Sequence, residues 1–294
     1  LQVFYEGQEK DKYETLFGAL KTTYNVNDNF TLKLITSAYH TLEQEYFDIF
    51  AQYALGEVDG NIGSETFGDV TYSRAIGTQL NHARNDLDAL IVNAEVKGFH
   101  NIKTKHQVEW GFKYTREDIR DRIVEWEVID SAGFSLNPPR IELPDIPTND
   151  QPYNSYTGPL VPYKNVRAKN FVTIDRLSGF GQWSLKDKIG SSEVWYNAGV
   201  RFHQWQVSGD NINGDSQIVF SPRAQFSLKP EWEKDILFRV SGGYYYQPPF
   251  YRELRDKTGT VQPNVKAQSS LHLVLGSDYS FKLWDRPFKM VAEA

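Results

Sequence analysis

Ten stretches of this chain alternate between two kinds of residue, and all of their charged residues fall on the same alternate positions. In one stretch Trp110, Phe112 and Tyr114 alternate with Glu109 and Lys113. No Asp, Glu, Lys or Arg stands on the apolar side of any stretch. A side-chain period of two indicates a β-strand with one dry face, which belongs against either a packed core or lipid. The ten stretches are 16–24, 30–38, 90–98, 108–114, 177–185, 196–202, 220–228, 236–244, 271–279 and 288–294.

Composition narrows the class of protein. The 294 residues include no Cys, which excludes a disulfide framework and a thiolate metal site. The net charge of -6, with no cluster of Lys and Arg, argues against a nucleic-acid partner. No segment approaches the ~20 apolar residues of a membrane-spanning helix. A transmembrane barrel gives no hydropathy peak either, because its lipid-facing residues alternate with polar ones.

The connections between the ten stretches alternate in length. This order predicts an antiparallel up-and-down sheet with short turns at one rim and long loops at the other, as in outer-membrane barrels. Seven of the 13 prolines fall within residues 130–168, which forbids regular ladder pairing there. The short connections are 25–29, 100–105, 186–192, 229–233 and 282–287, and the long ones are 42–86, 115–174, 204–218 and 246–268.

Aromatic residues gather near the short connections. Indole and phenol rings prefer the membrane–water interface, so this placement favours an aromatic girdle at one rim of a barrel. The alternative is that they close the end of a soluble core. The residues concerned are Tyr24, Phe99, Trp183, Trp195, Trp232 and Trp284.

Several local motifs resemble those of one family. They are AGVR at 198–201, SPR at 221–223, RVSGGYYYQPPFYRELR at 239–255, AQSSLHLVLGSDY at 267–279 and RPFK at 286–289, with IDSAGFSL at 129–136. Together they resemble the barrel of TonB-dependent receptors of the Gram-negative outer membrane. The resemblance is greatest to the subgroup with a carboxypeptidase-regulatory-like N-terminal domain.

The resemblance implies an all-β, antiparallel up-and-down transmembrane barrel of about 22 strands, closed by an N-terminal plug. It also implies energy-coupled import of a nutrient, with outer-membrane lipid, the protein's own plug, a TonB-type energy-coupling protein and a surface lipoprotein as partners. The sequence itself holds about ten strands and no plug or coupling peptide. We therefore expect residues 1–294 to be an internal part of such a barrel wall.

Two groups of residues are candidates for function. The polar face of neighbouring strands carries Arg176, Arg201, Arg223 and Arg239. These arginines either bridge to acids of the barrel or plug, or form a ladder that attracts an anionic substrate.

The outer loop carries Tyr246, Gln247, Tyr251 and Arg252. These residues either brace the loop or contact substrate or a surface partner, since Tyr and Arg are favoured where contacts carry binding energy.

We expect no enzyme activity, no cofactor and no metal site. The histidines lack metal-ligand spacing, and His203 and His272 fall on the charged face. Glu43 and Glu45 share a strand face, which favours a water-facing strand end over a catalytic carboxylate pair. In the acidic segment 209–216 the glycine is misplaced relative to the acidic ligands of a calcium loop and no closing glutamate follows, so the segment predicts a hairpin turn.

Three functions remain open at this stage. The first is an energy-coupled outer-membrane receptor and transporter. The second is a passive porin-like or structural barrel subunit, which would lack a plug. The third is a soluble all-β carbohydrate-binding domain, whose dry face would be a core. The cargo is not encoded in a recognisable motif.

Overall fold

The chain forms one antiparallel sheet. The computed structural model describes residues 2–131, 134–135 and 164–294. Sheet order follows chain order throughout, as in an up-and-down topology. The long strands are β1 (Gln2–Asn27), β2 (Phe30–Val58), β3 (Val70–Ile102), β4 (His106–Ser131), β6 (Lys164–Ile189), β7 (Ser192–Gly209), β9 (Gln217–Lys229), β10 (Asp235–Gln247), β11 (Gln268–Leu283) and β12 (Arg286–Glu293); the short β5 (Phe134–Ser135) and β8 (Ile212–Asn213) extend β4 and β7.

The predicted alternation of short and long connections is confirmed. The short rim has tight turns, such as the two residues Trp284 and Asp285, whose φ angles of 51° and 56° suit a type I′ hairpin. The predicted bounds of the first long connection, 42–86, are wrong, because β2 and β3 continue until only 59–69 joins them. Within 42–86 the strands carry charge on both faces of the sheet. The absence of charge from one face, by which the ten stretches were recognised, could therefore not identify these parts as strands. The proline-rich residues 136–163 lie outside the described part of the chain.

The strand register places all ten apolar sets on one face of the sheet. Leu34, Val96, Phe112, Gly179 and Phe202 form one row across β2, β3, β4, β6 and β7. The sets on the other strands join in the same phase. Each set was chosen from its own strand alone, so this agreement across nine interfaces confirms the face assignment.

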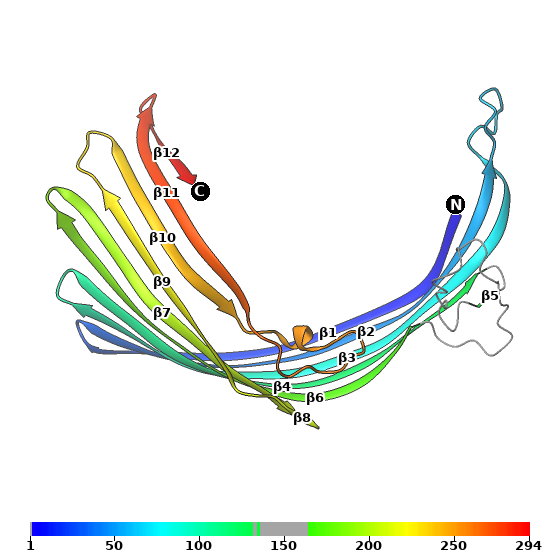
Figure 1. Ribbon diagram of the computed structural model, residues 1–294, viewed down its shortest axis with the longest axis horizontal. Coiled ribbons are helices and arrows are strands. Elements are labelled where there is room, and N and C mark those ends of the chain that lie inside the picture. Colours follow the sequence, from blue (N-terminus) through cyan, green and yellow to red (C-terminus); the bar gives the residue numbers. More distant parts are fainter. Residues whose placement is uncertain (1, 132–133, 136–163) are drawn as a thin grey trace, which may run out of the picture.

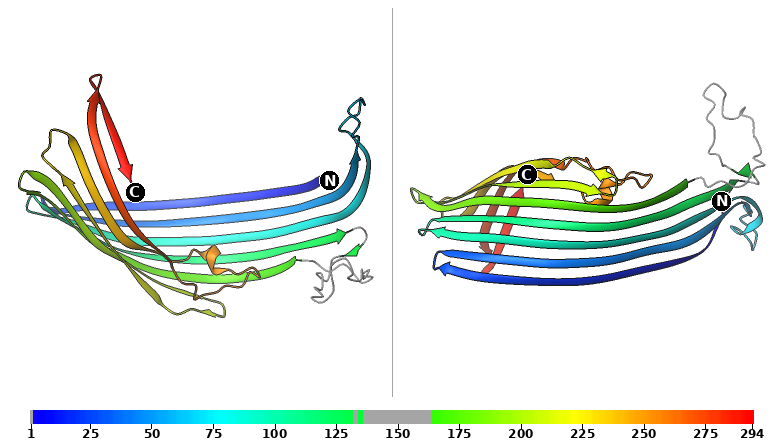
Figure 2. Two further views of the ribbon diagram at one scale, coloured as in Figure 1. Left: turned by 45° about the horizontal axis from the view of Figure 1, so that its top comes forward. Right: turned by 90° about the horizontal axis from the view of Figure 1, so that it is seen from below.

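The sheet is a single curved layer. Figure 1 and Figure 2 show the strands side by side along a trough, with the 3-10 helix η2 (Tyr251–Leu254) inside its curve. The main cluster of buried apolar residues lies where η2 and its flanking segment meet the sheet. That cluster uses Ala89 and Ile119, which alternate with the apolar set, so the apolar set lies on the convex face. Among the described residues no helix is long and apolar enough to cross a membrane.

The convex face carries a band of exposed apolar side chains. Leu16 is 74% exposed and Leu273 is 71% exposed, and exposed apolar residues occur on strands from β1 to β12. The band ends toward the long connections, where charge begins: His40 lies 2.8 Å from Asp88, and Arg116 lies opposite Val92. Toward the other rim it ends at the short turns.

Close packing within the sheet depends on glycines opposite aromatic rings. A Cβ added at Gly98 would lie 2.3 Å from the Trp110 ring, and one at Gly179 would lie 2.5 Å from the Phe202 ring. Each ring therefore covers the backbone of a neighbouring strand.

Only some of the aromatic residues near the short connections lie where the predicted girdle requires them, on the convex side or exposed in the turns. Trp183 faces the convex side, and Trp232 and Trp284 lie exposed in short turns. The assignments of Trp195 and Phe99 are wrong, since the register turns both to the concave face. Proximity to a turn does not fix the face, which changes with every residue along a strand.

Candidate functional site on the concave face

The segment between β10 and β11, residues 248–267, folds back onto the concave face of the sheet. β10 ends at Gln247, because the prolines that follow, Pro248 and Pro249, cannot donate to the ladder. Tyr251 and Leu254 then turn inward, with Leu254 fully buried. They pack with Val261 against residues of β3, β4, β6 and β7: Ala89, Ile119, Val172, Ile174, Trp205 and Val207. Apolar burial therefore holds this loop inside the trough.

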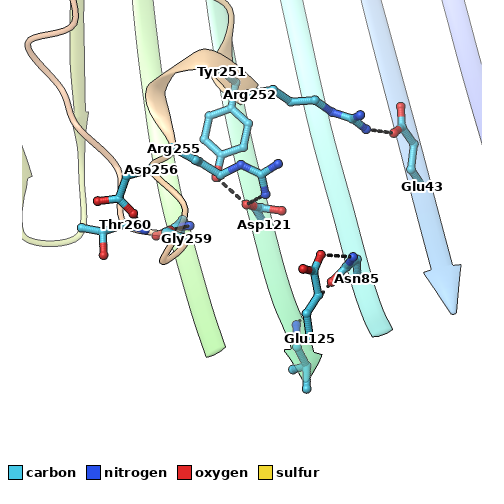
Figure 3. Close-up of polar contacts among 12 residues, drawn as sticks. Glu43, Asn85, Asp121, Glu125, Tyr251, Arg252, Arg255, Asp256, Gly259 and Thr260 are labelled. Carbon is cyan, nitrogen blue, oxygen red and sulfur yellow. Dashed lines mark hydrogen bonds and ion pairs between the residues drawn. The ribbon is translucent and has the colours of Figure 1, made fainter. Parts of the chain in front are cut away.

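Polar contacts fix the segment to four strands, β2, β4, β6 and β9. Asp121 of β4 is buried and accepts hydrogen bonds from the Tyr251 hydroxyl at 2.7 Å and from Arg255 Nη1 at 2.8 Å. Arg252 reaches Glu43 of β2, with 3.0 Å between Nη2 and Oε2. Figure 3 shows these side chains converging from the loop and the strands. The remaining anchors are the pairs Arg176–Pro249, Asn170–Gly259, Asp215–Asn264 and Gln217–Val265.

One glycine is required for this close approach. Gly259 has a φ of 82°, in the left-handed region that disfavours other residues. A Cβ there would also lie 2.7 Å from the Cβ of Ala168 on β6. The Asn170 amide of the same strand donates to the Gly259 carbonyl at 3.0 Å. Glycine thus lets the loop backbone touch the sheet.

A polar cavity of about 360 Å³ opens beside the docked segment. Its walls carry both signs of charge, so it suits a polar ligand with many hydrogen-bonding groups better than an apolar one. Carboxylates come mainly from the strands and cations mainly from the loop. The charged residues whose side chains line it from this face are Glu43, Glu45, Asp121, Glu125, Lys164, Arg252, Arg255, Asp256 and Lys257.

Two groups in the loop have shifted pKa values. Burial, together with the hydrogen bond to Asp121, raises the pKa of Tyr251, so the phenol stays protonated and remains a donor. Hydrogen bonds from the Thr258 hydroxyl and amide, with others from Gln262 and Thr260, lower the pKa of Asp256 to about 2. Asp256 therefore stays ionised and organises its own turn.

The predicted loop residues take different places. Tyr251 is buried in the docking contact, whereas Arg252 is exposed at the cavity and forms its ion pair with Glu43. Tyr246 and Gln247 end β10, and neither lines this cavity. The structure thus brings Tyr251 and Arg252 together and leaves the other two at the strand end.

The four predicted arginines all lie on the concave face, one on each of β6, β7, β9 and β10. Arg176 pairs with Glu117 at 2.6 Å, and Arg239 pairs with Asp278 at 2.7 Å and Glu293 at 3.0 Å. Within the described part of the chain, Arg201 and Arg223 have no carboxylate within 4.0 Å. The bridging interpretation is therefore confirmed for Arg176 and Arg239, and the ladder interpretation stays a prediction for Arg201 and Arg223.

Sequence reasoning missed the acceptor at the centre of the site. Asp121 lies in a charged stretch of sequence with no motif around it, and Arg255 is the last residue of the motif at 239–255. Their pairing joins residues 134 positions apart, so no local signal reports it. In the described ranges no group of three or more His, Asp or Glu residues is arranged to hold a metal ion.

The class that the geometry defines is an all-β wall of antiparallel barrel type, with an apolar convex face and a charged concave face. No family model and no curated protein matches the chain.

Two solved structures are similar over most of its length. One is the copper transporter OprC, with a TM-score of 0.42 and 8% identity, covering 95% of this chain and 47% of that protein. The other is the translocator domain of the autotransporter NalP from Neisseria meningitidis, with a TM-score of 0.29 and 10% identity, covering 97% and 80%. This chain thus spans about half of the copper transporter. Scores this low do not bear on function.

Proposed function

We propose that this chain forms part of the wall of an outer-membrane β-barrel that imports a nutrient from the surroundings of a Gram-negative bacterium. The observation that carries the proposal is the exposed apolar band, continuous in register over all ten long strands. A soluble sheet would bury such a face against a second layer. Across the described residues the opposite, concave face is the one that receives a packing segment.

The dimensions of the band support a membrane environment. A tilted transmembrane strand needs about 9–11 residues, and the apolar stretch 30–38 of β2 has nine. Charge returns to the convex face beyond it, at Asp88, which lies 2.8 Å from His40. The strands then continue for many residues, as they do where a barrel projects above the lipid.

The concave face supports a transport function. It corresponds to a water-filled lumen, and the docked segment 248–267 narrows that lumen on the side of the long connections. The cavity beside this segment, with Glu45 and Arg252 in its wall, offers a polar ligand a place to bind before it passes inward. Binding and passage require no covalent chemistry.

The energy-coupled form of the proposal rests on the motif resemblance to TonB-dependent receptors. In that form residues 1–294 are part of a barrel of about 22 strands, whose plug fills the lumen and contacts a TonB-type protein. The same motif resemblance makes a surface lipoprotein a further partner in this form of the proposal. The alternative within the membrane class is a passive porin-like barrel.

Two measurements on the full-length gene product test the proposal. Membrane fractions washed with sodium carbonate at high pH should retain the protein, and only detergent should release it. Release without detergent would refute the membrane assignment. The purified protein in a planar lipid bilayer should give no steady ion conductance, because a plug closes the lumen. A stable open conductance would refute energy-coupled import and favour the passive pore.

A further inference from the structure

The two arginines without carboxylate partners lie beside each other on the concave face. Arg201 of β7 lies opposite Ser221 of β9, and Arg223 follows two residues later on the same face of β9. Both are exposed to the trough. Gly243 lies opposite Arg223, and a Cβ there would lie 2.7 Å from the Arg223 Cβ, so glycine leaves room for this side chain.

Each of these arginines is held by an aromatic ring. The guanidinium carbon of Arg201 lies 5.4 Å from the centre of the Phe180 ring, and that of Arg223 lies 4.7 Å from the centre of the Tyr245 ring. Such stacking orients the planar fork and leaves its N–H donors free at the edge. Both cations are thereby oriented without being neutralised.

A buried hydroxyl lies in the same place without a hydrogen-bond partner. Ser221 is 1% exposed, and its Oγ has no partner among the described residues. Buried polar atoms are nearly always hydrogen-bonded, so we expect the Ser221 hydroxyl to have a hydrogen-bond acceptor or donor that the described residues do not supply. His203 is half-buried on the same face and interacts electrostatically with Arg201 and Arg223.

We propose that Arg201, Arg223 and the Ser221 hydroxyl form a binding site for a carboxylate group on the lumen wall. The site rests on the proposed function in one respect, because it needs the concave face to be a solvated lumen. Guanidinium groups recognise carboxylates through paired, charge-assisted hydrogen bonds, which are the strongest of their kind. The Ser221 hydroxyl supplies a further donor.

The carboxylate has two sources that share this chemistry. It belongs either to a small anion that diffuses through the lumen or to an acidic side chain of a segment of the same protein inside the barrel. The two sources are distinguished by experiment, since a diffusible anion exchanges with solvent and a protein segment forms cross-links.

The first measurement is equilibrium dialysis of radiolabelled citrate with the full-length protein in detergent at low salt. The double variant R201Q/R223Q should bind citrate at least about tenfold more weakly than the unchanged protein, because two charge-assisted contacts are lost. R201K/R223K keeps the charge but not the paired geometry and should give an intermediate loss. S221A should weaken binding several-fold.

The matched control is K21Q/K33Q. Lys21 and Lys33 lie on the concave faces of β1 and β2 and have no carboxylate within 4.0 Å among the described residues. This variant removes the same charge from the lumen, so unchanged citrate binding would attribute the effect to the arginine site. Equal losses in both double variants would refute a specific site and leave only the net charge of the lumen.

The second measurement covers the case in which the site is already filled by the protein. A photoreactive benzoylphenylalanine at Gln225, two residues from Arg223, should then cross-link to a peptide that contains Asp or Glu. The yield should fall in R201Q/R223Q and not in K21Q/K33Q. If R201Q/R223Q changes neither citrate binding nor the cross-links of a protein that still requires detergent, the site is refuted while the membrane proposal stands.

Discussion

A charge placed at the centre of the convex band should be far more damaging than one placed on the adjacent residue. Val240 is the middle residue of the apolar stretch of β10, is exposed, and lies between Phe226 and Leu275. Ser241 follows it, lies on the concave face, and has Gln225 and Val274 as its neighbours. The substitutions Val240→Arg and Ser241→Arg therefore add the same group to the same strand on opposite faces.

The size of the difference follows from the cost of an arginine in lipid. An Arg on the lipid face at the bilayer midplane of a barrel costs about 2–4 kcal/mol. This cost lowers the folding equilibrium constant about 30- to 700-fold. At Ser241 the new side chain enters water. Repulsion from Arg239, two residues away on the same face, costs at most about 1 kcal/mol, as like charges on neighbouring sheet positions do.

Folding of the full-length protein into lipid vesicles measures this difference. The folded form of a barrel keeps its compact mobility on gels run without boiling, so the folded fraction can be followed against urea concentration. The urea midpoint of Val240→Arg should fall well below that of Ser241→Arg, which should remain close to that of the unchanged protein. Equal midpoints, or a lower one for Ser241→Arg, would refute the assignment of the convex face to lipid.

Two further predictions concern the docked segment 248–267. Asp121→Asn should weaken the hydrogen bond between residue 121 and Tyr251 by about 1–3 kcal/mol and raise amide hydrogen exchange of the segment at least several-fold. Arg252→Gln breaks only an exposed ion pair and should change exchange little. Identical exchange in both variants would contradict the docking role of Asp121. The second concerns acid: because the pKa of Asp256 is lowered to about 2 in the folded loop, its contribution is complete above the ordinary value near 3.8 and is lost as pH falls toward 2. The protection of the turn's amides, measured relative to their intrinsic exchange rates at each pH, should therefore fall over that window in the unchanged protein and not in Asp256→Asn. A fall of equal size in both would dismiss this carboxylate as the cause.

Local alternation was a reliable guide to the strands and their faces. The side chains of a strand point alternately to its two sides, so a short stretch such as 236–244 reports its own dry face without knowledge of its neighbours. The same signal failed beyond the band. Past Leu42 on β2, for example, both faces carry charge, and the sequence loses the contrast that marks a strand.

The amino-acid sequence by itself determined that this chain is all-β, with one face free of charge over ten stretches, short turns at one rim and proline ending β10. The tertiary structure decided which residues meet. It brought Tyr251 and Arg255 to Asp121, gave Arg176 and Arg239 carboxylate partners, and left Arg201 and Arg223 without them in the described chain. The physical reason is distance along the chain. Periodicity is a property of adjacent residues, whereas these contacts depend on strand register and on where a loop folds back.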